Sequence, residues 1–426
     1  MGARDERSGF MNTDSRIYRP WPTALVIGLA AQILFLINLA RPTKPVFDET
    51  HYVTAANYLL RLNGPLNIEH PLLGKEIIAL GIILFGDNSF GWRFFSTIAA
   101  TAVVMGVFAI GWLVIGRVRP AAFAALFAIL NFTVFIQARI AMLDGFMAAF
   151  TVTGIAALIW GMQTPAEQPA RLWRRLALAG VLFGLAVGAK WAAVPFVAFA
   201  VLAIMFVPAD DAPALHRRRV TAVLLFGGLS LTAYFITFAP AFFYASDPLT
   251  LATLLPFQAT MYAQQTQALP PHTYQSAWWT WPLDIRPIWY LYEPVDGAVR
   301  GILLVGNPAI MWGGLVAVVA CVFAAYQAKS RAAGVMAGLW IAAYLPWVII
   351  PKKIGFFYYY YLPSIFLCLA LAAAFDHFGK GRMRQADAWF AGLAGVLFLY
   401  FYPIISAEAL PNDQAFLHWM WFFSWR

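Results

Sequence analysis

Charged residues are scarce in this chain, and cysteine is nearly absent. Only 12% of the 426 residues are charged, whereas 62% are hydrophobic and 36 are Phe, which is more apolar material than a soluble core absorbs. The two cysteines, Cys321 and Cys368, both lie inside apolar runs, so neither a disulfide framework nor a cysteine metal site is indicated. No internal repeat or low-complexity segment is present. Long apolar runs recur instead, and they predict an all-α polytopic membrane protein.

The apolar runs predict about eleven membrane spans with short connections, and hence a single integrated membrane domain over residues 1–426. The predicted spans are residues 21–40, 90–115, 121–137, 146–162, 176–188, 192–207, 220–243, 301–326, 335–350, 356–375 and 389–402. The first of them has no small-residue cleavage site after a short apolar core, so we interpret it as a retained helix and not as a cleaved signal peptide.

Lys and Arg predict the orientation of these spans. Short basic clusters lie in residues 1–20, 117–119, 171–175, 217–219, 329–331 and 380–384. The positive-inside bias puts all of them in the cytoplasm, together with the N-terminal tail 1–20, and puts the C-terminal tail 403–426 outside. This topology accounts for the net charge of +9 better than binding to nucleic acid does.

The stretch 46–75, between the first two spans, is unusually polar. It holds Asp48, Glu49, His51, Arg61, Glu69, His70 and Lys75. Ionisable groups at a membrane edge are costly to desolvate, which makes this stretch a candidate functional site, although any loop between spans must be polar. One-sided apolar stripes within the first outer loop, 41–89, predict two short interfacial helices. A second long outer loop, 244–300, is rich in Pro, Trp and Tyr.

In this topology the unusual polar residues all fall on the outer face. They are Asp48, Glu49, His70, Lys75, Arg139, Asp144, Lys190, Asp284, Arg286, Glu293, Lys352 and Lys353. Carboxylates suit a general base, and Lys or Arg suits a phosphate. Trp278, Trp279 and Trp281 suit either a sugar ring or the aromatic belt of a membrane interface.

Several strings in these outer segments carry a family resemblance. They are FDETHY and HPLLGK in the first loop, ARIAMLDGF, GLAVGAKWAAVPF, WPLDIRPIWYLYE, LLVGNPAIMW and FFYYYYLPSIFLCLALA. In this order they resemble the protein O-mannosyltransferases, a family of membrane glycosyltransferases of GT-C type. Leu72 replaces a Pro that is usual in the family, and neither an inserted soluble domain nor an endoplasmic-reticulum retention signal is found. The resemblance therefore implies a bacterial member in the inner membrane.

The resemblance also implies a chemistry. The family moves a sugar, most often mannose, from a polyprenyl-phosphate carrier to Ser or Thr hydroxyls with inversion, here on exported proteins at the periplasmic face. Asp48 matches the position of the catalytic base, and we expect Glu49 to position the acceptor or the backbone. Candidates for binding the carrier phosphate are Arg139, Lys75, Lys190, Lys352 and Lys353. Snorkelling to the lipid headgroups is the rival interpretation for each of these cations.

The remaining candidates have supporting roles. We expect Asp144 to orient Arg139 from the same turn, unless the two form a purely structural ion pair. His70 matches a family His but can also simply cap a turn, and Arg286 and Glu293 complete the set. No cofactor is firmly implied: a divalent cation is compatible with the carboxylates, but no compact His/Cys ligand pattern is present and no metal ligand is assigned.

The expected partners are a polyprenyl-phosphate-linked sugar, an acceptor, and the lipid bilayer, with no nucleic acid. The acceptor stays open between a protein and, as in aminoarabinose transfer to lipid A, a lipid or glycan. A multispan transporter is an alternative of a different class. It would need charged residues in the middle of its spans, and these spans are nearly free of them.

Overall fold

The structure is a computed structural model that describes residues 19–267, 270–350 and 354–426. Lys352 and Lys353, two predicted phosphate-binding residues, lie outside the described residues. The helices are α1 (Pro20–Leu36), α2 (Glu49–Leu60), α3 (Leu73–Phe85), α4 (Ser89–Ile115), α5 (Val118–Leu130), α6 (Phe132–Ala138), α7 (Leu143–Met162), α8 (Pro169–Ala189), α9 (Val194–Phe206), α10 (Arg219–Ile236), α11 (Leu254–Thr266), α12 (Pro308–Gln327), α13 (Arg331–Tyr344), α14 (Pro346–Ile349), α15 (Tyr361–Phe378) and α16 (Ala386–Ile405). The strands are β1 (Ile288–Val295) and β2 (Ala298–Leu304).

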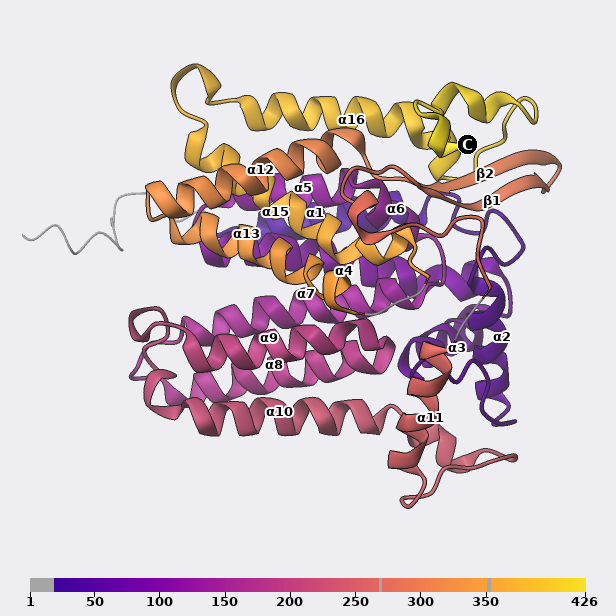
Figure 1. The fold of residues 1–426 in the computed structure, drawn as a ribbon, viewed down its shortest axis with the longest axis horizontal. Coiled ribbons are helices and arrows are strands. Elements are labelled where there is room, and N and C mark those ends of the chain that lie inside the picture. The colour runs from indigo at the N-terminus through magenta and orange to yellow at the C-terminus, as the bar shows by residue number, and fades with distance from the viewer. Residues whose placement is uncertain (1–18, 268–269, 351–353) are drawn as a thin grey trace, which may run out of the picture.

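The axes of most of the long helices are roughly aligned, and the helices pack side by side, as expected for a helical membrane protein (Figure 1). Within the described residues, eight helical stretches are long and apolar enough to cross a membrane, and the pair α5 and α6, bent by 63°, would make a ninth. The predicted first and sixth spans are apolar helices but shorter, Pro20–Leu36 and Trp191–Phe206. Each predicted span therefore coincides with an apolar helix, and the polytopic all-α fold class is confirmed.

The start of the eighth predicted span is wrong. Gly301 belongs to β2, and α12 begins only at Pro308, after Asn307 caps it by accepting a hydrogen bond from the Ala309 amide at 3.1 Å. The physical reason is that the short apolar run 301–305 suits a buried strand as well as it suits a helix. β1 and β2 form an antiparallel hairpin, with Ile288 opposite Leu304. β1 lies within the predicted second outer loop, 244–300, and β2 extends past the end of that loop.

The bend between α5 and α6 occurs at a buried asparagine. The side chain of Asn131 accepts a hydrogen bond from the Thr133 amide and donates to the carbonyl of Ser364 on α15 at 3.1 Å. The broken helix is thus pinned to the most buried span of the bundle, since 89% of the apolar window around α15 is inside the protein. The chain that leaves α6 is thereby directed into the outer turn before α7.

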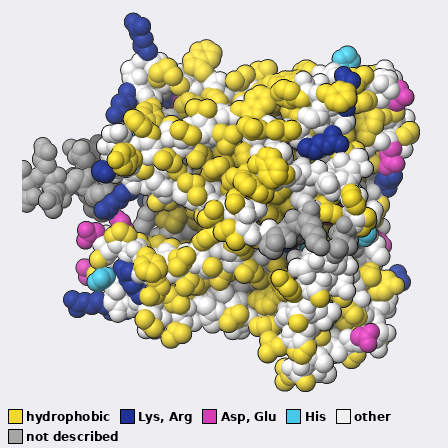
Figure 2. Space-filling model, viewed as in Figure 1, with side chains coloured by type: hydrophobic (Ala, Val, Ile, Leu, Met, Phe, Trp, Pro, Cys, Tyr) yellow, Lys and Arg dark blue, Asp and Glu magenta, His cyan; other side chains and the backbone are white. Residues whose placement is uncertain are grey.

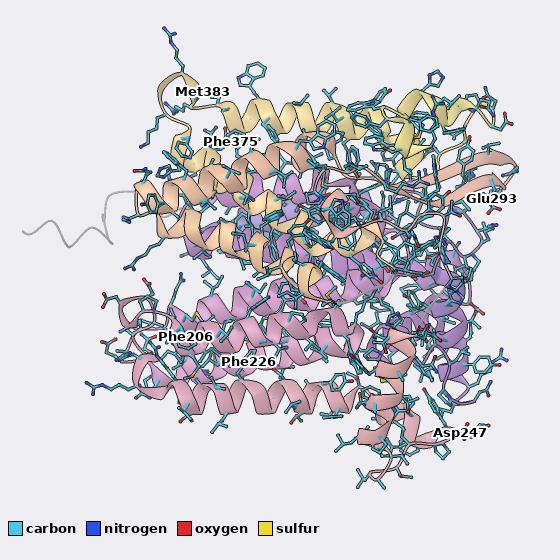
Figure 3. The ribbon with its side chains drawn as sticks, in the orientation of Figure 1. Phe206, Phe226, Asp247, Glu293, Phe375 and Met383 are labelled. Atoms are coloured by element: carbon cyan, nitrogen blue, oxygen red, sulfur yellow. The ribbon has the colours of Figure 1, made fainter. Side chains whose placement is uncertain are left out.

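Polar segments gather at one end of the bundle. There α2 and α11 lie across the direction of the spans, and the β-hairpin projects from the same end (Figure 1). Hydrophobic side chains cover most of the flank, whereas charged ones collect mostly toward the two ends (Figure 2). Glu293 and Asp247 mark the end that carries α2, and Phe206 and Met383 mark the opposite one (Figure 3). The two short helices predicted in the first outer loop are therefore present as α2 and α3.

Candidate active site

Asp48 lies at the start of α2 and is only partly buried. The hydroxyl of Tyr52, one turn later, donates a hydrogen bond to its Oδ2 atom at 3.3 Å. Burial raises the pKa of Asp48 above its usual range, and the positive charge of Lys190 opposes that rise while Asp144 adds to it. Asp48 therefore combines a weakly bonded carboxylate with a raised pKa, which is the state required of a general base.

Glu49, the next residue, has the opposite environment. Its side chain is fully buried, and both oxygens bind the guanidinium of Arg93, at 2.8 Å from Nε and 2.8 Å from Nη2. The backbone amides of Val46 and Ala141 donate to the same two oxygens at 2.8 and 2.7 Å. Of the two roles expected for Glu49, these contacts support positioning of the backbone, because they join the first outer loop to the turn before α7.

Sequence reasoning missed Arg93, which stands near the start of α4 and inside a predicted span. Besides Glu49, it donates hydrogen bonds to the carbonyls of Leu39, Pro42 and Lys44 at 3.3, 2.8 and 3.0 Å. The signal that could have found it is its position, since an arginine close to the end of an apolar run needs a buried partner.

Asp144 pairs with Lys190, so the expected pairing of Asp144 with Arg139 is wrong. The Lys190 ammonium donates to Oδ2 of Asp144 at 2.7 Å, and both side chains are almost completely buried. Asp144 stands on the first turn of α7 and Lys190 at the end of α8. Burial lowers the pKa of Lys190, but Asp144, Tyr359 and Asp48 together outweigh this effect and keep the pKa above its ordinary value. The ammonium is therefore a permanent positive charge.

Arg139 binds the end of α1. Its guanidinium donates to the carbonyls of Ile37, Asn38 (3.2 Å) and Ser406 (3.4 Å), and lies 5.1 Å from the ring centre of Phe135. Burial lowers the pKa of Arg139 to about 10, so the side chain stays charged at neutral pH. These contacts give it an anchoring role between α1 and the C-terminal tail, and none of them supports the predicted phosphate contact.

Lys75 is likewise occupied by the backbone. Its buried ammonium donates to the carbonyls of Leu66, Asn67 and His70 at 3.3, 2.5 and 2.9 Å, and burial lowers its pKa to about 7. Together with His70, it lines a cavity between the first outer loop and the segment 241–257. The His70 ring packs edge-on against Tyr52, with centroids 5.8 Å apart. The structure thus places Lys75 beside the candidate site but in a different cavity from Asp144.

Arg286 and Glu293 lie in the second outer loop, where they contact other chain segments. Arg286 donates to the carbonyls of Thr273 (3.2 Å) and Ser424 (2.9 Å), and Glu293 forms an exposed ion pair with Lys44. Neither is among the described residues that line the cavity beside Asp144. Their contacts hold the loop to the C-terminal tail and to the first outer loop.

A narrow cavity lies between α7, α9, α14 and α15, and we call it the Asp144 cavity. Its polar and aromatic lining consists of Asp144, Trp347, Tyr358, Tyr359 and Tyr361. The Lys190 ammonium lies 5.2 Å from the ring centre of Tyr358 and 6.0 Å from that of Tyr359, on the edge of this lining. The sequence predicts no role for any of the four tyrosines in FFYYYYLP.

Phe47 joins Asp48 to the same aromatic wall. Its ring stacks on Tyr290 of β1 at 4.3 Å and meets Tyr358 edge-on at 6.1 Å. A neighbouring cleft is lined by Trp278, Trp279 and Trp281 and shares Trp347 and Tyr359 with the Asp144 cavity. In the described part of the chain, no three His, Cys, Asp or Glu side chains come together as a metal site.

Comparisons with known proteins identify the family. Residues 84–245 match the dolichyl-phosphate-mannose-protein mannosyltransferase family, and residues 250–425 match the C-terminal four-transmembrane region of protein O-mannosyltransferase. Polyprenol-phosphate-mannose–protein mannosyltransferases of Mycolicibacterium smegmatis and Mycobacterium tuberculosis are 28% and 26% identical, over 95% and 96% of this chain and 92% of each relative. An undecaprenyl phosphate 4-amino-4-deoxy-L-arabinose arabinosyl transferase of Pseudomonas fluorescens is 26% identical over 50% of this chain and 38% of its own length.

Solved structures share the fold. The S. cerevisiae protein O-mannosyltransferase complex bound to the sugar donor superposes with a TM-score of 0.80 at 12% identity, over 96% of this chain and 93% of the matched chain. ArnT from Cupriavidus metallidurans bound to undecaprenyl phosphate gives 0.59 at 15% identity, over 92% and 67%. The two family models together span most of the sequence, and the fold agrees with them. This multi-pass membrane protein therefore belongs to the protein O-mannosyltransferase family of GT-C glycosyltransferases.

Proposed function

We propose that the protein transfers mannose from a polyprenyl-phosphate carrier to Ser or Thr hydroxyls of exported proteins, with inversion at the sugar carbon. The observation that carries this proposal is the meeting of Asp48, Asp144 and Lys190 at one end of the bundle. The three residues come from different connections between helices, and each is electrostatically coupled to the other two. A base and a buried cation beside a cavity are the groups that this transfer needs.

The reaction follows from the positions of these groups. The acceptor hydroxyl oxygen attacks the anomeric carbon of the sugar, and the hydroxyl proton passes to the carboxylate of Asp48. The bond between that carbon and the phosphate oxygen breaks, and the carrier phosphate leaves with the bonding electrons. The Lys190 ammonium stabilises the charge that develops on the phosphate. Because burial raises the pKa of Asp48, its carboxylate is a stronger proton acceptor than an exposed aspartate.

Of the predicted phosphate-binding residues we retain Lys190, because the cationic groups of Arg139 and Lys75 bind backbone carbonyls.

We extend the proposal to the cell location: the bacterial inner membrane, with the N-terminus in the cytoplasm and the site facing the periplasm. Three ion pairs support the grouping of basic loops at the end opposite Asp48, since Arg117 pairs with Asp376, Arg119 with Asp387 and Arg331 with Asp211. The positive-inside rule assigns that end to the cytoplasm. Reporter fusions test this orientation. A fusion after Arg219 should read cytoplasmic, and a fusion at the C-terminus should read external.

The decisive assay uses the purified protein in nanodiscs with polyprenyl-phosphate mannose and either a Ser/Thr peptide or lipid A as acceptor. We expect mannosylated peptide, its loss in Asp48→Asn, and no labelled lipid. Label on lipid A alone would favour the second acceptor class, represented by the P. fluorescens relative. We also propose that no metal is required, because Lys190 supplies the positive charge; loss of transfer in EDTA with recovery on adding Mg²⁺ or Mn²⁺ would contradict this.

A further inference from the structure

Tyr361 has a buried hydroxyl group that nothing in the described chain uses. It begins α15, lines the Asp144 cavity and is only 2% exposed, and its hydroxyl has no hydrogen-bond partner among the described residues. The adjacent Tyr360 differs, because its hydroxyl accepts a hydrogen bond from Nε1 of Trp340 at 2.9 Å. Burying a hydroxyl without a partner costs free energy, and folded proteins rarely do so. An unused hydroxyl on a residue that lines a cavity therefore points to a polar ligand.

We propose that the Tyr361 hydroxyl binds a hydroxyl group of the sugar carried by the donor. This inference rests on the proposed function, and it assigns the part of the donor that the inner wall of the cavity recognises. A phenol can donate and accept at once, as can a sugar hydroxyl, so the two groups are matched. Asp144 is on the same wall, and its carboxylate, one oxygen of which binds Lys190, can also accept a hydrogen bond from a neutral polyol.

We assign two parts of the donor, its phosphate and its sugar, to different residues of the site. The Lys190 ammonium binds Oδ2 of Asp144 and lies 5.2 and 6.0 Å from the ring centres of Tyr358 and Tyr359, and we assign the carrier phosphate to this cation. Tyr361 and Trp347 line the cavity itself, where an aromatic face and a free hydroxyl suit a sugar ring. Tyr361 therefore contributes to selectivity for the sugar, whereas Lys190 binds the phosphate of a carrier with or without a sugar.

The test compares binding of polyprenyl-phosphate mannose with binding of sugar-free polyprenyl phosphate in nanodiscs. Tyr361→Phe removes only the hydroxyl. We expect its affinity for the mannosylated carrier, and its kcat/KM, to fall by about 5- to 100-fold, as for a lost hydrogen bond to a substrate hydroxyl. Its affinity for the sugar-free carrier should stay at the wild-type value. Tyr360→Phe is the matched control and should leave both affinities unchanged.

Thermal unfolding without ligand provides a second measurement. Tyr361→Phe should unfold no earlier than wild type because it loses no internal hydrogen bond, whereas Tyr360→Phe should unfold at a lower temperature. An equal loss of affinity for both carriers would overturn the proposal, because the hydroxyl would then bind phosphate. Unchanged affinity for the mannosylated carrier would overturn it as well. If wild type binds the mannosylated carrier through Tyr361 but transfers nothing, the proposed function fails and this inference stands.

Discussion

Two buried ion pairs lie at the end of the bundle that carries α2, and they have different surroundings. In the first, Glu49 and Arg93 are both fully buried. Backbone amides fill the remaining positions on the carboxylate, and backbone carbonyls those on the guanidinium. In the second, Asp144 and Lys190 are nearly as buried, but they stand beside a cavity with an aromatic wall. A buried pair of a carboxylate and a cation can therefore hold the structure together or form part of a site. Which role it has depends on what occupies the remaining hydrogen-bonding positions of the two groups.

The two acidic residues of the motif FDETHY repeat this contrast within one turn of chain. Asp48 accepts a 3.3 Å bond from Tyr52 and is partly accessible, whereas both oxygens of Glu49 are saturated. Glu49 holds the loop in place, and Asp48 is thereby presented to the site. Variants at each of these groups separate the anchor from the site by their different effects on stability and on turnover.

The largest effect is expected for Glu49→Gln. The change leaves the Arg93 charge buried without its counterion, which typically costs about 3–5 kcal/mol of folding free energy. We expect a lower unfolding temperature and loss of transfer together. Differential scanning fluorimetry in detergent and peptide mannosylation measure the two quantities.

Glu293→Gln is the matched control for that variant, because its ion pair with Lys44 is exposed. Exposed pairs contribute only about 0–1 kcal/mol, so its unfolding temperature should equal that of wild type. A stable Glu49→Gln protein that binds donor but transfers nothing would contradict the anchoring role and return Glu49 to the chemistry.

Asp48→Asn should abolish chemistry while the fold survives. Losing a general base typically lowers the rate by about 10² to 10⁴, or roughly 3–5 kcal/mol of transition-state stabilisation. Unfolding temperature and donor affinity should match wild type. Turnover with purified donor and peptide, together with donor binding, checks the prediction. Near wild-type turnover would rule out Asp48 as the base and direct attention to Asp144.

Lys190→Met should weaken transfer and change its pH dependence. Removing the cation that opposes the developing phosphate charge should lower kcat/KM by about 10- to 100-fold. Lys190 also lowers the pKa of Asp48, and its removal leaves the Asp144 charge unpaired, which raises that pKa further. Since the base acts deprotonated, the acid limb of the rate profile should move to higher pH. An acid limb that stays at the wild-type pH would show that Lys190 does not influence the pKa of the catalytic base.

Arg139→Ala has the smallest expected effect and decides between two roles. Loss of its bonds to the end of α1 should lower stability by about 1–3 kcal/mol, with affinity for polyprenyl phosphate unchanged. Thermal unfolding and carrier binding measure both. If carrier affinity falls while the unfolding temperature holds, the phosphate contact predicted from the sequence is right and the anchoring role is not.

The sequence alone was sufficient for the fold class and for placing Asp48, Asp144 and Lys190 at the same end of the bundle. A bilayer demands long apolar helices, and each span reverses the direction of the chain, so the strings around Asp48, Asp144 and Lys190 had to share one side. Periodicity also predicted α2 and α3 within the first outer loop. It failed at Gly301, because a short apolar run suits a strand and a helix equally well.

The partners of each charge were decided only by the tertiary structure. Asp144 stands five residues after Arg139 in the chain, yet it faces Lys190 on another helix end, and Glu49 meets Arg93 inside a predicted span. The Tyr361 hydroxyl could be recognised as unused only once its surroundings were known. The reason is that hydrophobic patterning depends on each residue's own transfer free energy, whereas a hydrogen bond or ion pair depends on the direction of two side chains brought together by packing.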